Sequence, residues 1–336
     1  MSLEYCDSFN TYSNNTQLAR RYTVGCNFQI GSPGPGGVGQ FVSGVGDGGA
    51  YMNVFVTPRN EYYLGFDLKS SDNSHGLNFL QILTAAGAVI CSISNASAIN
   101  TTFGNSASGL MVNGTWYQIH IYIKRSATVG ILTVKIDGVT VLNLTGLNTG
   151  ATDIGLIRLV PAFGWGNLLS MLSNFWVLNT LGSHSNTWPV GRMKVQALYP
   201  AADGTYTAWT PNSGSTHYNR VNQAQADDDT TYNAAITSGD KDCYGIGALP
   251  GSPAHIHGVM VTAIVRKDDV DSKNLQVFTK SGSTETFSPD IVAPLNYLSS
   301  TTNGTAAILH GDDPNTGAEW TQTNVNALEV GVKVTL

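Results

Sequence analysis

Short apolar runs, broken by glycine and asparagine, dominate the pattern of residues 22–177. Four of these runs are rich in β-branched and aromatic side chains and alternate partly between apolar and polar positions, which is typical of strands. They are residues 51–57, 62–68, 77–83 and 88–93. The pattern predicts short antiparallel strands that each bury one face.

The clearest alternation lies in residues 114–124, where one face is apolar and the other carries Gln118 and His120. The face predicted to enter the core consists of Tyr117, Ile119, Ile121 and Ile123. Further on, residues 132–137 and 139–144 flank Asp137-Gly138. This dipeptide predicts a tight hairpin, because glycine accepts the positive φ of such turns.

Three segments of the first half resemble the second half of a laminin G or concanavalin A-like domain. They read NGTWYQIHIYIK (residues 113–124), LTVKIDGVTVLNL (132–144) and LSNFWVL (172–178). The resemblance covers about residues 5–182 and implies an N-terminal concanavalin A-like jelly-roll sandwich for residues 1–182.

The composition then shifts to serine, asparagine, glycine and proline, so we place a linker at residues 183–192. Residues 193–336 are predicted to form a second, C-terminal β-sandwich-like domain. In it the nearly apolar run 258–265 predicts a central strand. One short helix is expected at about residues 322–330, begun by Thr321 or Thr323 and ended by Gly331. The fold class predicted for the whole chain is therefore all-β.

The second half is also similar to a region that recurs in bacteriophage virion proteins behind a laminin G-like module. The pieces that carry the resemblance include ADG (202–204), WTP (209–211), DDDTTY (227–232) and DPNTGAEWT (313–321). It implies a non-enzymatic virion structural protein, a capsid decoration, cement or head-fibre protein on the particle surface. Its partners would be other virion proteins, either the major capsid protein or tail components. The chain itself would form a symmetric homo-oligomer.

A second function stays open, a tail-associated, lectin-like adhesin that binds a glycan of the host surface. The feature that would favour it is an exposed aromatic side chain beside Asn and Asp on one rim of the sandwich. On either interpretation the protein is synthesised in the cytoplasm of the host bacterium and is expected at the virion surface.

Charge sets nucleic acid aside as a partner. The net charge is −6 and only 12% of residues are charged, whereas nucleic-acid binding depends on clustered Lys and Arg. The N-terminus lacks the pattern of a signal peptide, in which a basic stretch is followed by an apolar one. No apolar run reaches the ~18 residues that span a bilayer. We therefore expect no membrane partner, and we expect the four cysteines to be free, mostly buried thiols.

A catalytic role is not predicted. Glycoside hydrolysis on such a sandwich needs two carboxylates across the scissile bond, and the sandwich half contains only Glu4 and Glu61 among the glutamates. The nearest pairing, Glu61 with Asp67, has the wrong spacing. The only local histidine cluster is His255 and His257, for which no third metal ligand is apparent, so no metal and no cofactor is predicted.

The candidate contacts to a ligand or partner are Trp165 and the acidic triplet Asp227, Asp228 and Asp229. Trp165 lies between two glycines and is the tryptophan expected to be exposed. The triplet lacks the spacing of an EF-hand. It is expected to fix a turn or to contact a neighbouring subunit.

Overall fold

The computed structural model describes most of the chain, and we divide it into two units. The sandwich unit comprises Glu4–Thr180 and Thr187–Val195, and the second unit comprises Met1–Leu3, Leu181–Asn186 and Gln196–Leu336. Part of the segment that the sequence analysis assigns to the linker thus groups with the sandwich. The described residues are 1–24, 28–44, 50–71, 77–95, 97–160, 163–164, 168–182, 184, 188, 192–268, 272–291, 298–299 and 308–336.

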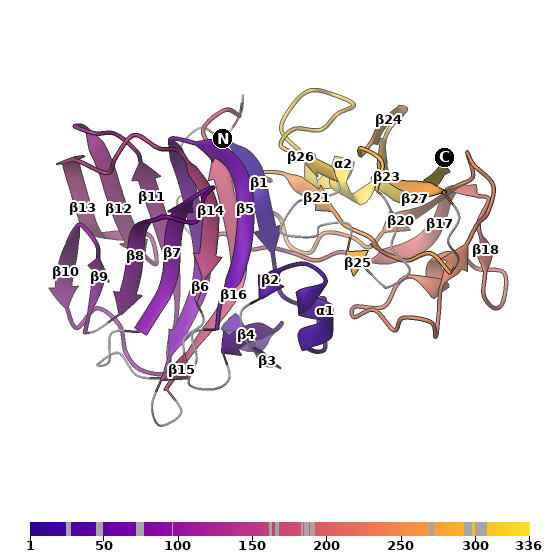
Figure 1. The fold of residues 1–336 in the computed structure, drawn as a ribbon. Helices are drawn as coiled ribbons and strands as arrows, with labels where there is room; N and C mark the ends of the chain where they lie inside the picture. Colours follow the sequence, from indigo (N-terminus) through magenta and orange to yellow (C-terminus); the bar gives the residue numbers. More distant parts are fainter. Residues whose placement is uncertain are drawn as a thin grey trace. The chain divides into compact units, whose positions relative to one another are not determined.

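Two antiparallel sheets form the sandwich, as the sequence predicts (Figure 1). The nine-stranded sheet has the order β13-β12-β11-β6-β16-β4-β3, and β1 and β15 also pair with β16. Its strands are β1 (Ser2–Asp7), β3 (Phe28–Gly31), β4 (Phe41–Gly44), β6 (Glu61–Ser70), β11 (Trp116–Lys124), β12 (Gly130–Ile136), β13 (Val139–Leu147), β15 (Phe163–Gly164) and β16 (Leu168–Asn179).

The seven-stranded sheet has the order β10-β9-β8-β7-β14-β5-β2. In Figure 1 the strands β8, β7, β14 and β5 run side by side across it, although β14 lies far from both of its neighbours in sequence. Its strands are β2 (Thr23–Val24), β5 (Met52–Arg59), β7 (Leu77–Thr84), β8 (Val89–Asn95), β9 (Ala98–Thr101), β10 (Gly104–Ser108) and β14 (Ile154–Leu159).

Alternation along β11 decides what enters the core between the sheets. Ile119, Ile121 and Ile123 are fully buried, as predicted, and burial of such a side chain stabilises the fold by about 1.5–3 kcal/mol. Tyr117, which was predicted to enter the core with them, is only partly buried, and its hydroxyl accepts a hydrogen bond from the Val112 N–H at 2.9 Å. The hairpin between β12 and β13 is also confirmed, since Asp137 and Gly138 have φ values of 47° and 85°.

A short helix that the sequence analysis does not predict begins the sandwich unit. Helix α1 spans Asn15–Ala19, and its N-cap Asn14 accepts a hydrogen bond from the Gln17 backbone N–H at 3.0 Å. The capping residue was visible in the sequence. Five residues are too few to show a helical apolar period, which is why pattern analysis misses this element.

The second unit is built on a five-stranded sheet of order β17-β20-β27-β23-β24, accompanied by three two-stranded sheets. The five strands are β17 (Pro200–Thr207), β20 (Lys241–Ile246), β23 (Asn274–Ser281), β24 (Thr284–Phe287) and β27 (Glu329–Thr335). The small sheets pair β18 (Thr210–Pro211) with β19 (Asn233–Ala234), β21 (Val259–Val261) with β26 (Ile308–His310), and β22 (Ile264–Val265) with β25 (Leu298–Ser299).

Two predictions for this unit are wrong in detail. Residues 258–265 do not form one central strand, because they divide into β21 and β22, each in its own two-stranded sheet. Helix α2 has the predicted start, with Thr321 as N-cap, but spans only Gln322–Asn326. The residues after it enter β27, the middle strand of the five-stranded sheet, so sheet pairing overrides the local helical pattern.

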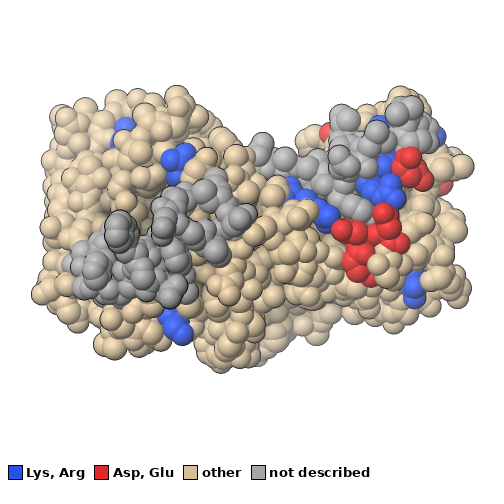
Figure 2. Space-filling view, turned by 60° about the horizontal axis from the view of Figure 1, so that its bottom comes forward, with Lys and Arg blue, Asp and Glu red and all other residues tan. Residues whose placement is uncertain are grey.

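Only 12% of the residues are charged. On the face in Figure 2 most atoms belong to uncharged residues, and acidic side chains gather next to basic ones in one area.

Within the described ranges, no helix has the length and apolar character needed to cross a membrane. Cys6, Cys91 and Cys243 are free thiols, as predicted, and Cys26 lies outside the described residues.

Candidate functional site

Four polar side chains lie in register across the seven-stranded sheet. Ser92 of β8 pairs with Gln81 of β7, Gln81 with Arg158 of β14, and Arg158 with Asn53 of β5. Ile157, next to Arg158, is fully buried, and side chains alternate along a strand. Arg158 and its lateral neighbours therefore point to the outer face of the sheet. We call these four residues the polar row.

Hydrogen bonds join the members of the polar row into one chain. Arg158 Nε donates to Asn53 Oδ1 at 2.9 Å, and Arg158 Nη1 donates to Gln81 Oε1 at 3.4 Å. Gln81 Nε2 in turn donates to Ser92 Oγ at 3.4 Å. These bonds fix the orientation of both amides and of the guanidinium before any ligand arrives.

Aromatic side chains border the row on β5. The Arg158 guanidinium lies over the ring of Tyr51, 4.5 Å from its centroid, a cation–π contact. Two residues beyond Asn53, the ring of Phe55 is 40% exposed. Gln81, Ser92, Arg158 and Tyr51 are partly exposed, while Asn53 is buried. The surface thus combines oriented polar groups with partly exposed rings.

Part of the outer face of the nine-stranded sheet, around β11, is covered instead. A segment that we call the strap, described residues 188 and 192–195, lies on it. Met193 N–H donates to Gln118 Oε1 at 2.8 Å, and Gln118 Nε2 donates to the Met193 carbonyl at 2.6 Å. This pair of bonds joins the strap backbone to a side chain of β11.

An aromatic cluster holds the other end of the strap. The rings of Tyr63 and Tyr122 stack with centroids 4.5 Å apart, and Trp188 packs against them at 5.4 and 5.8 Å. Lys135 Nζ lies 3.9 Å from the Trp188 ring centroid. Arg192 also pairs with Asp137 at 3.2 Å. The strap is therefore anchored by ring packing, cation–π attraction and an ion pair.

Burial changes the titration of groups on this covered face. It lowers the pKa of His120 to about 4, with a further lowering by Lys135. It also raises the pKa of Asp67, although hydrogen bonds from Asn174 and Gln118 partly offset the rise. Near neutral pH, His120 is thus the uncharged form, and its Nε2 lies 2.9 Å from the acceptor Gln118 Oε1.

The carboxylates that the sequence analysis weighs do not form a catalytic pair. Glu61 and Asp67 lie six residues apart on one strand, a separation of roughly 20 Å, whereas glycosidase pairs are about 5–9.5 Å apart. Each also has structural partners, because Tyr122 Oη donates to Glu61 at 2.8 Å and Asn174 Nδ2 donates to Asp67 at 2.5 Å. Glu4 likewise accepts from Asn179 Nδ2 at 2.9 Å.

The predicted acidic triplet forms a turn in the second unit. Asp227 accepts a hydrogen bond from the Thr231 hydroxyl at 2.8 Å, and Asp228 has a φ of 56°. Asp229 accepts from Arg266 Nε at 3.0 Å. These contacts explain the triplet as local structure, and its contact with a neighbouring subunit stays a prediction. Trp165 lies outside the described residues.

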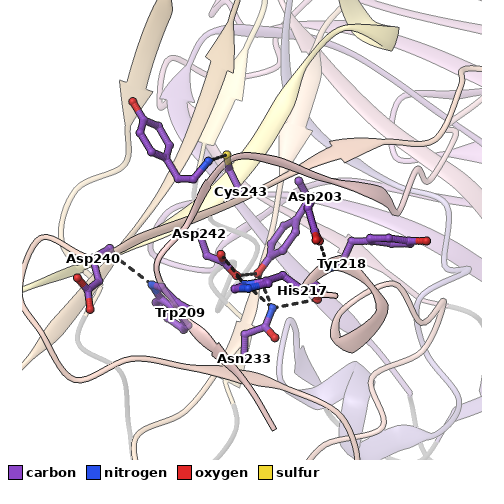
Figure 3. Close-up of polar contacts among 10 residues, drawn as sticks. Asp203, Trp209, His217, Tyr218, Asn233, Asp240, Asp242 and Cys243 are labelled. Atoms are coloured by element: carbon purple, nitrogen blue, oxygen red, sulfur yellow. Dashed lines mark hydrogen bonds and ion pairs between the residues drawn. The ribbon is translucent and has the colours of Figure 1, made fainter. Parts of the chain in front are cut away.

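A buried polar cluster in the second unit centres on Asp242 of β20 (Figure 3). Its carboxylate lies 3.0 Å from His217 Nδ1 and accepts hydrogen bonds from Tyr244 Oη at 2.6 Å and Asn233 Nδ2 at 3.1 Å. Burial raises the pKa of Asp242, and the bonds from Tyr244 and His217 lower it in part. Because Asn233 also donates to the His217 carbonyl, the cluster fastens β19 and the segment before residue 218 to β20.

In the described part of the chain, no three His, Cys, Asp or Glu side chains gather as metal ligands. His255, one of the two histidines considered in the sequence, lies 3.0 Å from Glu319. That contact is an exposed pair in which the histidine side chain is 61% accessible.

Sequence reasoning did not single out the polar row. Asn53, Gln81 and Ser92 are polar residues within predicted strands, but the alternation there is only partial and assigned none of them to a face. Arg158 lies outside every predicted strand. The signal needed to join them is the strand order β8-β7-β14-β5, which a linear pattern does not contain.

No protein-family model and no curated protein matches the chain. Among solved structures it is similar to a sialidase, with 13% identity and a TM-score of 0.39 over 54% of this chain and 19% of that one. A protein of unknown function with a galectin-like fold from Bacillus subtilis has 12% identity and a TM-score of 0.35, over 53% and 96% of the chains. The carbohydrate recognition domain of Emp46p, in its metal-free form, has 7% identity and a TM-score of 0.35, over 53% and 98%.

Proposed function

We propose that the protein is a non-catalytic glycan-binding protein whose binding surface is the polar row with Tyr51 and Phe55. The observation that carries this proposal is the row itself, four oriented polar side chains in register on an open sheet face beside aromatic rings. A sugar presents many hydroxyl groups and an apolar ring face. Fixed amides and a guanidinium bind the hydroxyl groups, and aromatic rings pack against the apolar ring face.

This surface resembles the feature that favours an adhesin over a purely structural protein. Tyr51 is a partly exposed aromatic side chain, and Asn53 lies two residues away on the same face. Arg158 stands where an aspartate was anticipated, and the site lies on a sheet face rather than on a rim. The chemistry required is the same, since donors and acceptors surround an aromatic surface.

Binding without catalysis is the consistent interpretation of the carboxylates. The acids of the sandwich unit considered above are either about 20 Å apart along β6 or engaged with Asn174, Tyr122 and Asn179. Neither arrangement places two carboxyl groups on opposite sides of one glycosidic bond.

The place of action stays a proposal that the sequence resemblance supports, namely the surface of a bacteriophage particle. There the protein would act as a tail-associated adhesin, or, with the glycan role absent, as a decoration, cement or head-fibre protein. Immunogold labelling of particles distinguishes these positions. Label at the tail supports the adhesin, label over the capsid supports the decoration protein, and unlabelled particles contradict both.

A glycan array tests the proposed function. The full chain is expected to bind a subset of glycans, and the Tyr51→Ala and Asn53→Ala variants are expected to lose at least tenfold in affinity for them. Thr140→Ala is the matched control, since Thr140 is an exposed residue of the other sheet. Absence of binding by the wild-type chain, or equal loss in Thr140→Ala, would contradict the proposal.

A further inference from the structure

We infer that the ligand of the polar row is an anionic sugar, whose carboxylate or sulfate group binds Arg158. This inference rests on the proposed function and adds the chemical class of the glycan to it. It depends on three observations about Arg158, which are the charges around it, its hydrogen-bond partners and its remaining donor.

The charge of the seven-stranded sheet is entirely positive. Its strands contain two charged residues, Arg59 and Arg158, and no aspartate or glutamate. Arg59 lies six residues beyond Asn53 on β5, about 20 Å along the strand, so it does not share the position of Arg158. The charged side chains on the strands of this sheet are therefore cations, and a fixed cation attracts an anion.

Arg158 also differs from the arginines that pair with a carboxylate. Arg21 pairs with Asp7 at 3.4 Å, Arg192 with Asp137 at 3.2 Å, and Arg266 Nε with Asp229 at 3.0 Å. In contrast, the partners of Arg158 are the neutral amides of Asn53 and Gln81. These amides orient the guanidinium and leave its charge uncompensated.

One nitrogen of the guanidinium remains available. Nε and Nη1 donate within the row, and among the described residues Arg158 Nη2 has no hydrogen-bond partner. The side chain is partly exposed, so Nη2 can donate to a ligand oxygen at the surface. Charge-assisted bonds of this kind are about twice as strong as neutral ones, and the ring of Tyr51 holds the guanidinium in place.

Paired glycans test the inference. The probes are a neutral oligosaccharide, the same oligosaccharide with a terminal carboxylate-bearing sugar, and the same oligosaccharide with a sulfate ester. We expect at least about tenfold tighter binding of one or both anionic members, with an advantage that shrinks as salt rises from 50 to 300 mM. Which anionic member binds tighter identifies the group that Arg158 recognises.

Variants separate charge from folding. Arg158→Gln should remove the preference for the anionic member, and Arg158→Lys should keep part of it because the charge remains. Lys124→Gln, the same loss of charge on the other sheet, should keep all of it, and thermal unfolding checks that each variant folds. Equal binding of all three probes by the wild-type chain would overturn this inference and leave the proposed function standing, whereas absence of binding to every probe would overturn both.

Discussion

Both outer faces of the sandwich carry polar side chains, but the two faces differ in how far these side chains are exposed and in what they bond. On the nine-stranded sheet Asp67, Gln118, His120 and Trp176 are each at most 2% exposed, and the strap supplies backbone partners for Gln118. On the seven-stranded sheet the members of the polar row bond to one another across the strands, and all of them except the buried Asn53 stay partly exposed. A covered face stabilises the fold, because its buried polar groups need partners, and an open face keeps donors for a ligand.

The comparison predicts the largest loss of stability at Trp176. Its ring is 1% exposed and lies over Gly65, so that a Cβ on Gly65 would meet it at 2.4 Å. Trp176→Ala should lower the free energy of unfolding by about 3–5 kcal/mol, measured by denaturant titration. Phe55→Ala on the open face is the control, with a loss of less than about 1 kcal/mol. Equal losses would erase the distinction between the faces.

A pH titration examines the covered face through His120. Its pKa falls from 6.5 in the unfolded chain to about 4 in the folded protein, so between these values the unfolded chain binds more protons. The contribution of His120 to the free energy of unfolding is therefore fully present above pH 6.5. It declines by on the order of 3 kcal/mol as the pH falls toward 4.

The raised pKa of Asp67 acts in the opposite sense. The folded protein takes up that proton more readily than the unfolded chain. Protonation of Asp67 therefore offsets part of the loss in the free energy of unfolding at low pH. His120→Asn should therefore flatten the decline between pH 6.5 and 4 in denaturant titrations at a series of pH values. A variant with the slope of the wild-type chain would show that His120 is not buried as a neutral group.

An intermediate effect is expected at Gln118, whose amide bonds the strap backbone. Gln118→Ala leaves the N–H and carbonyl of Met193 without these partners, at a cost of about 1–3 kcal/mol. Hydrogen exchange at the Met193 amide should also accelerate. Gln81→Ala, the same change in the polar row, should cost less than about 1 kcal/mol because water replaces its partners. A larger loss at Gln81 than at Gln118 would invert the comparison.

The smallest effect is expected at Lys135. Lys135→Met removes its cation–π contact with Trp188, worth about 0.5–1 kcal/mol. It also removes a charge that lowers the pKa of His120, so that pKa should move upward. An NMR titration of the His120 ring measures this shift, and an unchanged or lower pKa would place Lys135 away from the imidazole.

Local pattern determined several strands of the sandwich and the buried face of β11. The alternation around Ile119, Ile121 and Ile123 requires only period-two geometry, and the Asp137-Gly138 turn requires only a residue that accepts positive φ. Both follow from neighbours in sequence, and both agree with the structure. The failures at residues 258–265 and 322–330 occurred where pairing with distant strands outweighed local preference.

The two faces themselves were decided only by tertiary structure. Arg158 joins Asn53 and Gln81 because β14 inserts between β5 and β7, and Met193 reaches Gln118 across 75 residues of chain. Within the strands that it predicts, the sequence by itself indicated most of the side chains that leave the core, because that depends on the polarity of adjacent positions. Which of them are covered and which stay open depends on long-range strand order and on where a connecting segment lies, and neither leaves a periodic mark in the sequence.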